Sequence, residues 1–268
     1  MSPLLLKIAL APALVALATL AGRRFGARVA GWLVGFPVVA GPVLWFYTRE
    51  QGAPFGAGAA AGTVLGNVSL CLFLLTYAWS ATRRGWVPSM LLGWLAFVSA
   101  TLLLDRISWA GQAPLLLRLA AAFAALAATV RGLPRLERRP AGPRPPHDLL
   151  LRMVATAVLV VTLTGLARIL GPSLSGLFTP FPVATTVLVV FAHREGGPTG
   201  VLAVLEGFIP SLYSFASFCA ALSFGLQRWP VALAFGVALL VSLTFQTLVL
   251  LRAGVLSTPT VPARPQSP

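Results

Sequence analysis

Long uninterrupted apolar runs dominate the chain, and short polar segments separate them. A helix needs about 20 apolar residues to cross the hydrocarbon core of a bilayer. The runs are continuous and do not alternate between apolar and polar residues, so they favour helices over a membrane β-barrel. We therefore predict an all-α polytopic membrane protein with about nine transmembrane helices. The predicted spans are 4–22, 29–48, 56–80, 87–104, 113–130, 149–170, 174–192, 199–225 and 229–251.

The chain also repeats itself at an offset of 145 residues, without a gap. Positions 4–73 and 149–218 share 19 identities in 70, whereas chance in this Leu- and Ala-rich composition gives about one in ten. The match includes Leu4-Leu5-Leu6-Lys7 against Leu149-Leu150-Leu151-Arg152, Phe36-Pro37-Val38 against Phe181-Pro182-Val183, and Arg49-Glu50 against Arg194-Glu195. We interpret this pattern as a duplication of a four-helix unit.

The predicted helix at 113–130 has no counterpart in the duplication, and this decides how the two units face. Four helices return a chain to its starting side, so one extra crossing makes the second unit enter from the opposite face. The pattern therefore predicts two inverted four-helix repeats joined by an extra helix, an architecture found in many secondary transporters. The expected organisation is a first repeat at 1–108, a connecting transmembrane helix at 109–131, a cytoplasmic Pro- and Arg-rich linker at 132–148, a second repeat at 149–252 and a disordered cytoplasmic tail at 253–268.

Composition and charge strengthen this interpretation. With 57% hydrophobic and only 10% charged residues, the chain falls outside the range of soluble domains. The net charge of +14 comes from Lys and Arg placed between apolar runs, so it indicates topology and not nucleic-acid binding. Fourteen of the 20 basic residues fall on one predicted side. The positive-inside rule then predicts a bacterial-type inner-membrane protein with its amino terminus outside and its carboxyl terminus in the cytoplasm.

Each repeat carries the same irregularity in its second helix. Gly35-Phe36-Pro37 with Gly41-Pro42 interrupts span 29–48, and Thr179-Pro180-Phe181-Pro182 interrupts span 174–192. Proline frees polar backbone groups at membrane depth, and paired breaks in corresponding segments indicate a binding site near the bilayer midplane. The alternative is that both breaks only bend their helices for packing. The candidate substrate-binding residues are Phe36, Pro37, Gly41, Pro42, Phe181, Pro182, Thr185, Thr186 and Asn67.

Glu206 is the only acidic residue well inside a predicted span, and its repeat partner is Ala61. A carboxylate at membrane depth is costly, so it is expected to be neutral, paired or facing water, and it marks a functional site by default. We predict a proton-coupling role for Glu206. The alternative is a protonated glutamate hydrogen-bonded between helices. The Arg-Glu-x-Gly turns at 49–52 and 194–197 are interpreted as helix ends with local ion pairs.

The residue inventory argues against an enzyme. The two histidines are His147 in the linker and His193 at a membrane edge, and the sequence has no nucleophile, nucleotide-binding or metal-ligand motif. We expect no cofactor and no metal. The favoured function is a secondary transporter or permease that moves an unidentified small solute or lipid-linked solute by alternating access. The alternative is a membrane-embedded scaffold or subunit of a larger complex. Expected partners are membrane lipids, the small solute and a second copy in a homo-oligomer, with no nucleic acid.

Overall fold

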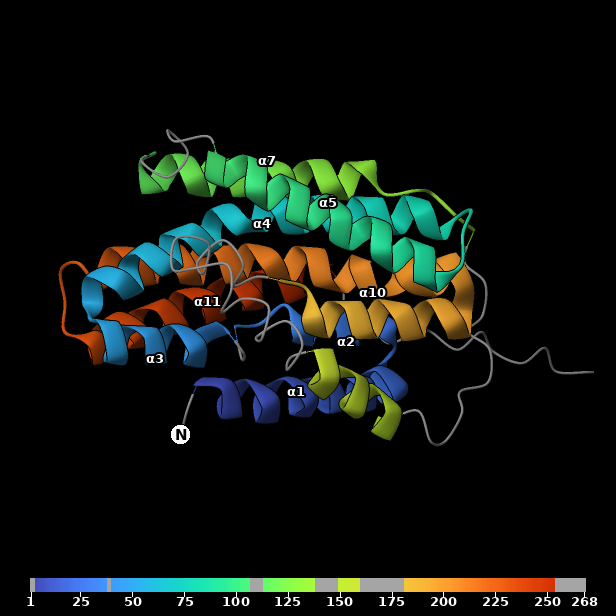
Figure 1. The fold of residues 1–268 in the computed structure, drawn as a ribbon, viewed down its shortest axis with the longest axis horizontal. Helices are drawn as coiled ribbons and strands as arrows, with labels where there is room; N and C mark the ends of the chain where they lie inside the picture. The colour runs from blue at the N-terminus through green and yellow to red at the C-terminus, as the bar shows by residue number, and fades with distance from the viewer. Residues whose placement is uncertain (1–2, 38–39, 107–112, 138–148, 160–180, 254–268) are drawn as a thin grey trace, which may run out of the picture.

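The structure is a computed structural model that describes residues 3–37, 40–106, 113–137, 149–159 and 181–253. Within these ranges the regular elements are all helices. They run roughly along one direction and form an elongated bundle (Figure 1). Their bounds are α1 Pro3–Phe25, α2 Ala27–Val34, α3 Ala40–Gln51, α4 Ala53–Ala81, α5 Trp86–Arg106, α7 Leu115–Gly132, a short helix Leu149–Leu159, α10 Val183–Gly225 and α11 Val231–Ala253.

Five helices of the described chain are long and apolar enough to cross a membrane, namely α4, α5, α7, α10 and α11. The all-helical membrane architecture is therefore supported, whereas the total of nine spans stays a prediction. Predicted span 29–48 is divided between α2 and α3, which are 8 and 12 residues long. Of predicted span 149–170, the structure describes only Leu149–Leu159.

The helix α10 reverses direction at Gly197, so one 43-residue element contains two antiparallel parts. Gly197 has φ 60° and ψ −152°, a backbone conformation that is essentially restricted to glycine. A Cβ atom at Gly200 would lie 2.4 Å from the carbonyl oxygen of Ala192. In a straight helix these two residues, eight positions apart, would be separated by about 12 Å. The two parts of α10, yellow and orange, therefore lie side by side (Figure 1).

We call the first repeat, residues 1–108, the first segment and the second repeat, residues 149–252, the second segment. The turn at the equivalent position of the first segment has the same construction. Gly52 separates α3 from α4 and has φ 90° and ψ 163°. The rings of Tyr47 and Phe55 pack edge to face across this turn, with centroids 5.8 Å apart. Positions 47 and 55 correspond to Ala192 and Gly200 at the 145-residue offset. Both segments of the repeat therefore place a glycine reversal at the same position and pack equivalent residues across it.

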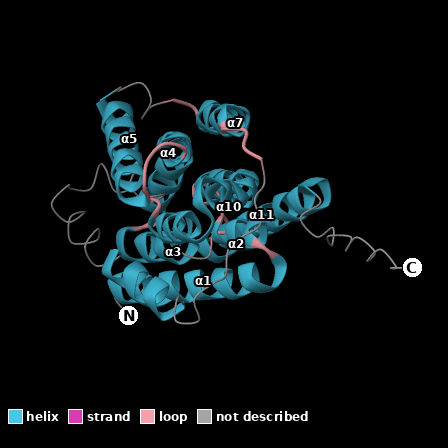
Figure 2. Cartoon of the chain, turned by 90° about the vertical axis from the view of Figure 1, so that its right-hand side faces the viewer, coloured by secondary structure: helices cyan, strands magenta, loops and turns pink. Residues whose placement is uncertain are grey.

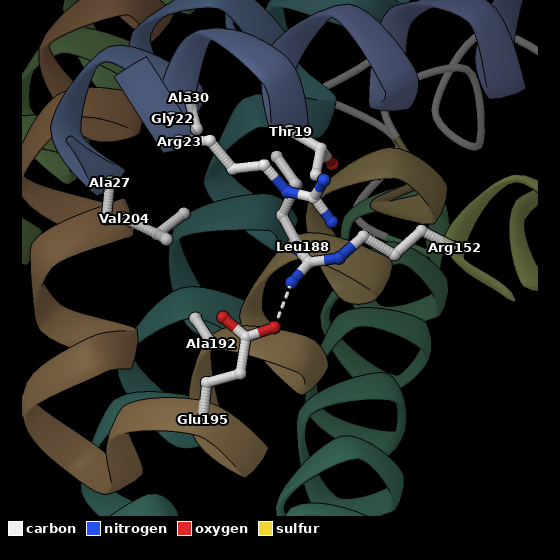
Figure 3. A pocket seen from close by; sticks show the side chains of 10 residues that line it. All are labelled: Thr19, Gly22, Arg23, Ala27, Ala30, Arg152, Leu188, Ala192, Glu195 and Val204. Carbon is white, nitrogen blue, oxygen red and sulfur yellow. Dashed lines mark hydrogen bonds and ion pairs between the residues drawn. The ribbon is translucent and has the colours of Figure 1, made fainter. Parts of the chain in front are cut away.

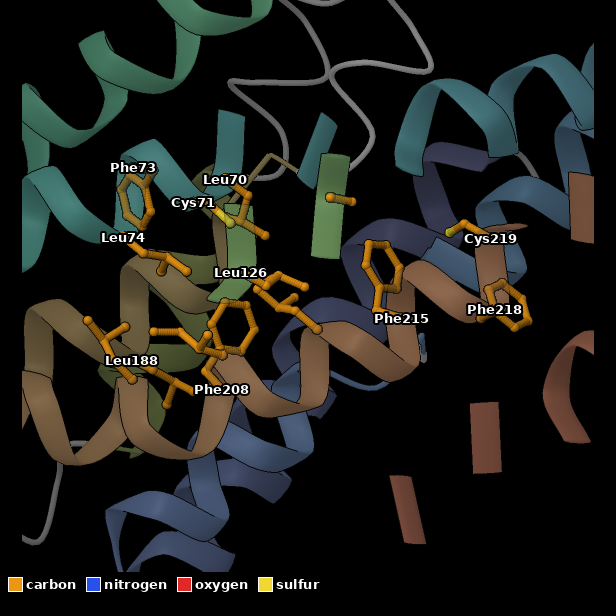
Figure 4. Packing of buried hydrophobic residues seen from close by; sticks show 14 of the residues in the cluster. Leu70, Cys71, Phe73, Leu74, Leu126, Leu188, Phe208, Phe215, Phe218 and Cys219 are labelled. Carbon is orange, nitrogen blue, oxygen red and sulfur yellow. The ribbon is translucent and has the colours of Figure 1, made fainter. Parts of the chain in front are cut away.

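The long part of α10 lies at the centre of the bundle, in contact with α2, α4, α7 and α11 (Figure 2). Fully buried aromatic and aliphatic side chains of α4 and α10, such as Phe73, Leu74 and Phe218, form the core (Figure 4). The outer helices expose large apolar residues, including Leu95, Leu116 and Leu240, which are 63%, 79% and 65% exposed. Such exposed apolar surface fits contact with lipid chains.

Glycines allow α2 and α10 to approach each other closely. A Cβ atom at Gly31 would lie 2.0 Å from the carbonyl oxygen of Val204, and one at Gly207 would lie 1.9 Å from that of Arg28. Small residues are the usual means of helix association in membranes, where van der Waals packing replaces the hydrophobic effect. This contact joins the first and second segments of the repeat, and it positions the polar groups described next.

Candidate functional site

A small cavity with charged walls lies where α1, α2, the helix Leu149–Leu159 and α10 meet (Figure 3). Its volume is about 40 Å³, enough for water or a small polar group. Four polar residues line it, namely Thr19, Arg23, Arg152 and Glu195, and the remaining lining residues are apolar or glycine. The close approach of α1 to α2 forms one wall, since a Cβ at Gly22 would contact Ala30.

A buried ion pair lies at the base of this cavity. The Nη2 atom of Arg152 donates a hydrogen bond to Oε1 of Glu195, and the two side chains are only 7% and 15% exposed (Figure 3). The Arg152 guanidinium also lies over the ring of Phe191, 4.5 Å from its centroid. The aromatic face and the carboxylate together fix the position of the guanidinium plane.

Arg23 approaches the cavity from the opposite wall. It lies in the last turn of α1, where the helix dipole favours a cation. Its side chain points into the cavity toward the region of Arg152 (Figure 3). Arg23 is exposed, and no ion pair or hydrogen bond of its side chain is found among the described residues. The described charged groups lining the cavity are thus two guanidinium groups and one carboxylate.

Glu206 forms a second ion pair, with Arg28. The Nε atom of Arg28 donates a hydrogen bond of 2.9 Å to Oε2 of Glu206, and Nη2 donates a second bond of 2.5 Å to the same oxygen. The two side chains are 37% and 34% exposed. Of the three states expected for this carboxylate, the structure therefore shows a paired group that also reaches the surface. The pair joins α2 to α10, one helix from each segment of the repeat.

Both proline breaks occur in the structure, and both start a helix. The carbonyl oxygen of Pro37 accepts the N–H of Gly41 at 2.9 Å, and that of Pro182 accepts the N–H of Thr186 at 2.8 Å. These two bonds are equivalent at the 145-residue offset. At the start of a helix the missing proline N–H has no helical partner to lose. The first break thus lies between α2 and α3, and the second immediately precedes α10.

The first break packs against the second segment of the repeat. Pro37 and Gly41 are buried, while Phe36 and Pro42 are half-buried. A Cβ atom at Gly41 would lie 3.6 Å from the Phe218 ring of α10. The break therefore contributes to the interface between the two segments.

The second break packs against α5. The ring of Phe181 lies 5.9 Å from that of Trp94 and 5.1 Å from that of Phe97. Trp94 Nε1 donates a hydrogen bond to the hydroxyl of buried Thr186 at 3.1 Å. Thr185 and Pro182, which are close to Thr186 in the sequence, are also buried. Each break thus packs on the other segment, and the contacts observed for the described residues do not join the two breaks directly.

Asn67 lies fully buried in α4. Its amide nitrogen donates to the carbonyl oxygens of Thr63 and Val64 in its own helix, at 3.0 and 3.4 Å. Its Oδ1 atom lacks a hydrogen-bond partner in the described part of the chain. A buried amide oxygen without a partner is costly and is available to a ligand or water. The hydrogen bonds of Asn67 among the described residues stay within α4 and do not link it to either proline break.

The cavity brings together residues that the hydropathy pattern places only at helix ends. The repeat nevertheless contains a sequence pattern that could have indicated this cavity. Thr19, Arg23 and Glu195 are identical to their partners Thr164, Arg168 and Glu50, and Arg152 corresponds to another cation, Lys7. Three of four polar lining positions are thus identical, against 19 in 70 overall. Thr164 and Arg168 lie outside the described residues.

Other chemistry is sparse in the described structure. No group of three or more His, Cys, Asp or Glu residues that could hold a metal ion is found among the described residues. Cys71 and Cys219 are buried free thiols. Comparison with known proteins finds no matching family model, no matching curated protein and no matching solved structure. The function is therefore inferred from the repeat and the site geometry alone.

Proposed function

We propose that the protein is a secondary transporter or permease that moves a small solute or a lipid-linked solute across an inner membrane by alternating access. The observation that carries this proposal is the recurrence of one local structure in the two segments of the repeat. Each has a proline that starts a helix, and each then reverses its chain at a glycine fifteen positions further on, at Gly52 and Gly197.

Inverted repeats, which the sequence predicts for this chain, support alternating access because two near-equivalent halves can exchange outward-open and inward-open forms. The contacts of the broken helices fit such an exchange. The first break packs on α10 of the second segment, and the second break packs on α5 of the first. A shift of one segment against the other would therefore change the surroundings of both breaks together. We assign the solute to the region of Phe36, Pro37, Gly41 and Pro42 with Phe181, Pro182, Thr185, Thr186 and Asn67.

We further propose that Glu206 couples transport to protons. Its carboxylate is paired with Arg28 across the α2–α10 contact, so protonation would remove one charge of a pair that joins the two segments. Both side chains are more than a third exposed, so the pair is not enclosed by the helix bundle. It can therefore separate during a transport cycle without opening the core.

The direct test is solute flux through purified full-length protein in proteoliposomes. We would load vesicles with inorganic phosphate, a dicarboxylate, a neutral amino acid, a sugar or a fluorescent short-chain phosphatidylglycerol, one at a time, and measure counterflow. We expect saturable flux of one of these classes. We also expect Pro37→Ala and Pro182→Ala to fold normally but reduce that flux, because alanine neither fixes the backbone φ angle nor lacks an N–H donor, so the geometry of each break would change. Absence of flux for every class would favour the scaffold alternative.

The coupling role has its own test in the same vesicles. Glu206→Gln preserves side-chain shape and removes ionisation, so we expect normal folding, retained solute exchange and loss of uphill uptake driven by a proton gradient. Glu50→Gln is the control, because it makes the same charge change at an exposed position. Undiminished concentrative uptake by Glu206→Gln, with unchanged pH dependence, would remove this residue from the mechanism.

A further inference from the structure

We propose that the cavity between Arg23 and Arg152 is a binding site for a phosphate-type oxyanion. The proposal goes beyond the transport function, because it concerns binding at equilibrium and holds whether or not the protein moves a solute. The shared chemistry is a tetrahedral phosphate group, either free in solution or in a lipid headgroup.

The first argument is the donor geometry. Arg23 comes from the end of α1 and Arg152 from the helix Leu149–Leu159, so their guanidinium groups enter the cavity from different walls (Figure 3). Guanidinium groups only donate hydrogen bonds, and their planar fork matches phosphate oxygens in a bidentate manner. A tetrahedral oxyanion has enough oxygens to accept from two forks that approach from different directions.

The second argument is electrostatic. Two cations that line one small cavity repel each other, and Glu195 compensates only part of this charge among the described residues. Arg152 is 7% exposed, so its environment screens charge weakly and strengthens a charge-assisted bond to an anion. Arg23 is exposed and can reach an incoming anion first. Glu195 then acts as a competitor, because the anion must share Arg152 with it.

The third argument comes from the duplication. Three of the four polar positions, those of Thr19, Arg23 and Glu195, are identical in the repeat and the fourth exchanges Arg152 for Lys7, against 19 identities in 70 positions overall. Packing alone does not require this, since a cavity wall can be lined by many residue types. The Thr19 hydroxyl donates to the carbonyl oxygen of Val15 in its own helix, at 2.7 Å. Retention of the two cations and the carboxylate therefore carries the argument, and it points to recognition of a charged group.

The location also fits both sources of phosphate. The sequence places Arg23 at the predicted cytoplasmic face, where the cavity would meet lipid headgroups and cytosolic anions alike. The two sources are separable by experiment. A free anion binds the delipidated protein in solution, whereas a headgroup stays with the protein as a retained lipid.

The test uses full-length protein, delipidated in a maltoside detergent, with two probes. In one arm inorganic phosphate is titrated by calorimetry at constant ionic strength. In the other, phosphatidylglycerol is added and retained lipid is counted by native mass spectrometry. We compare wild type with Arg23→Gln and with the matched control Arg24→Gln, which removes the same charge one residue away at an exposed position that does not line the cavity.

Loss of a charge-assisted hydrogen bond should weaken binding about tenfold or more in Arg23→Gln, and Arg24→Gln should leave it nearly unchanged. Glu195→Gln should bind phosphate more tightly because the competitor loses its charge, while Glu50→Gln, with the same charge change, should not. An Arg23-dependent signal with inorganic phosphate identifies a free anion, and one with phosphatidylglycerol alone identifies a headgroup. Equal losses in Arg23→Gln and Arg24→Gln, or no binding of either probe, would overturn the proposal.

Discussion

The two Arg-Glu-x-Gly turns provide the most instructive comparison within this molecule. They occupy equivalent positions in the repeat, and both reverse the chain at a glycine with positive φ, Gly52 or Gly197. Their glutamates nevertheless differ. Glu50 is exposed at the end of α3, whereas Glu195 is 15% exposed and bound to Arg152 at the charged cavity.

Local sequence therefore controls the backbone reversal of each turn, whereas tertiary neighbours control whether its glutamate forms an ion pair. The backbone reversal needs only a glycine, so it appears in both segments. The buried ion pair needs Arg152 to arrive from another helix, so its formation depends on how that helix packs. In the proposed transport cycle such an asymmetry is expected, because two equivalent halves adopt different conformations in any one state.

The largest expected effect is on membrane sidedness, because a reporter at each turn reads either one side of the membrane or the other. The inverted repeat predicts that a reporter inserted at Arg49-Glu50 is periplasmic and one at Arg194-Glu195 is cytoplasmic. Insertions at Arg84 and within 135–145 serve as references and should both read cytoplasmic. Signals from the same side at Glu50 and Glu195 would exclude the inverted arrangement, though not the repeat itself.

The next largest effect should separate the two glutamates by stability. Glu195→Ala leaves the buried Arg152 without its carboxylate and should cost about 3–5 kcal/mol, whereas an exposed change such as Glu50→Ala should stay within about 0.5 kcal/mol. Thermal unfolding of the detergent-solubilised protein measures both variants. Similar losses in the two would mean that Glu50 has a buried partner equivalent to Arg152.

The smallest effect concerns the glycines, for which the two segments should behave alike. Gly52→Ala and Gly197→Ala each force a side chain into a backbone region that only glycine occupies readily, at about 1–3 kcal/mol. Gly58→Ala in α4 is a suitable control, because nothing lies within 4 Å of the added Cβ, and it should be neutral or slightly stabilising. A loss at only one of Gly52 and Gly197 would show that the turns differ in more than their glutamates.

The sequence alone predicted the helical membrane class, the duplication, and the positions of the proline breaks and the glycine turns. It predicted each proline as an interruption within one span, whereas the structure has a helix starting there. These features depend on local causes. Apolar runs long enough to span a bilayer must form helices, proline starts a helix where its N–H is not needed, and a positive φ selects glycine. For this reason Pro37 and Pro182, and Gly52 and Gly197, hold equivalent backbone positions in the structure.

Only the tertiary structure decided which charged groups meet. Arg28 and Glu206 are 178 residues apart and Arg152 and Glu195 are 43 apart, and no local pattern specifies either pair. Their meeting depends on the close α2–α10 contact at Gly31 and Gly207 and on the packing of the helix that carries Arg152 against α10, where Arg152 also lies over the ring of Phe191. The physical reason is that charge pairing depends on distance in space, which helix packing sets, whereas a helix or a turn forms from bonds between neighbours in the chain.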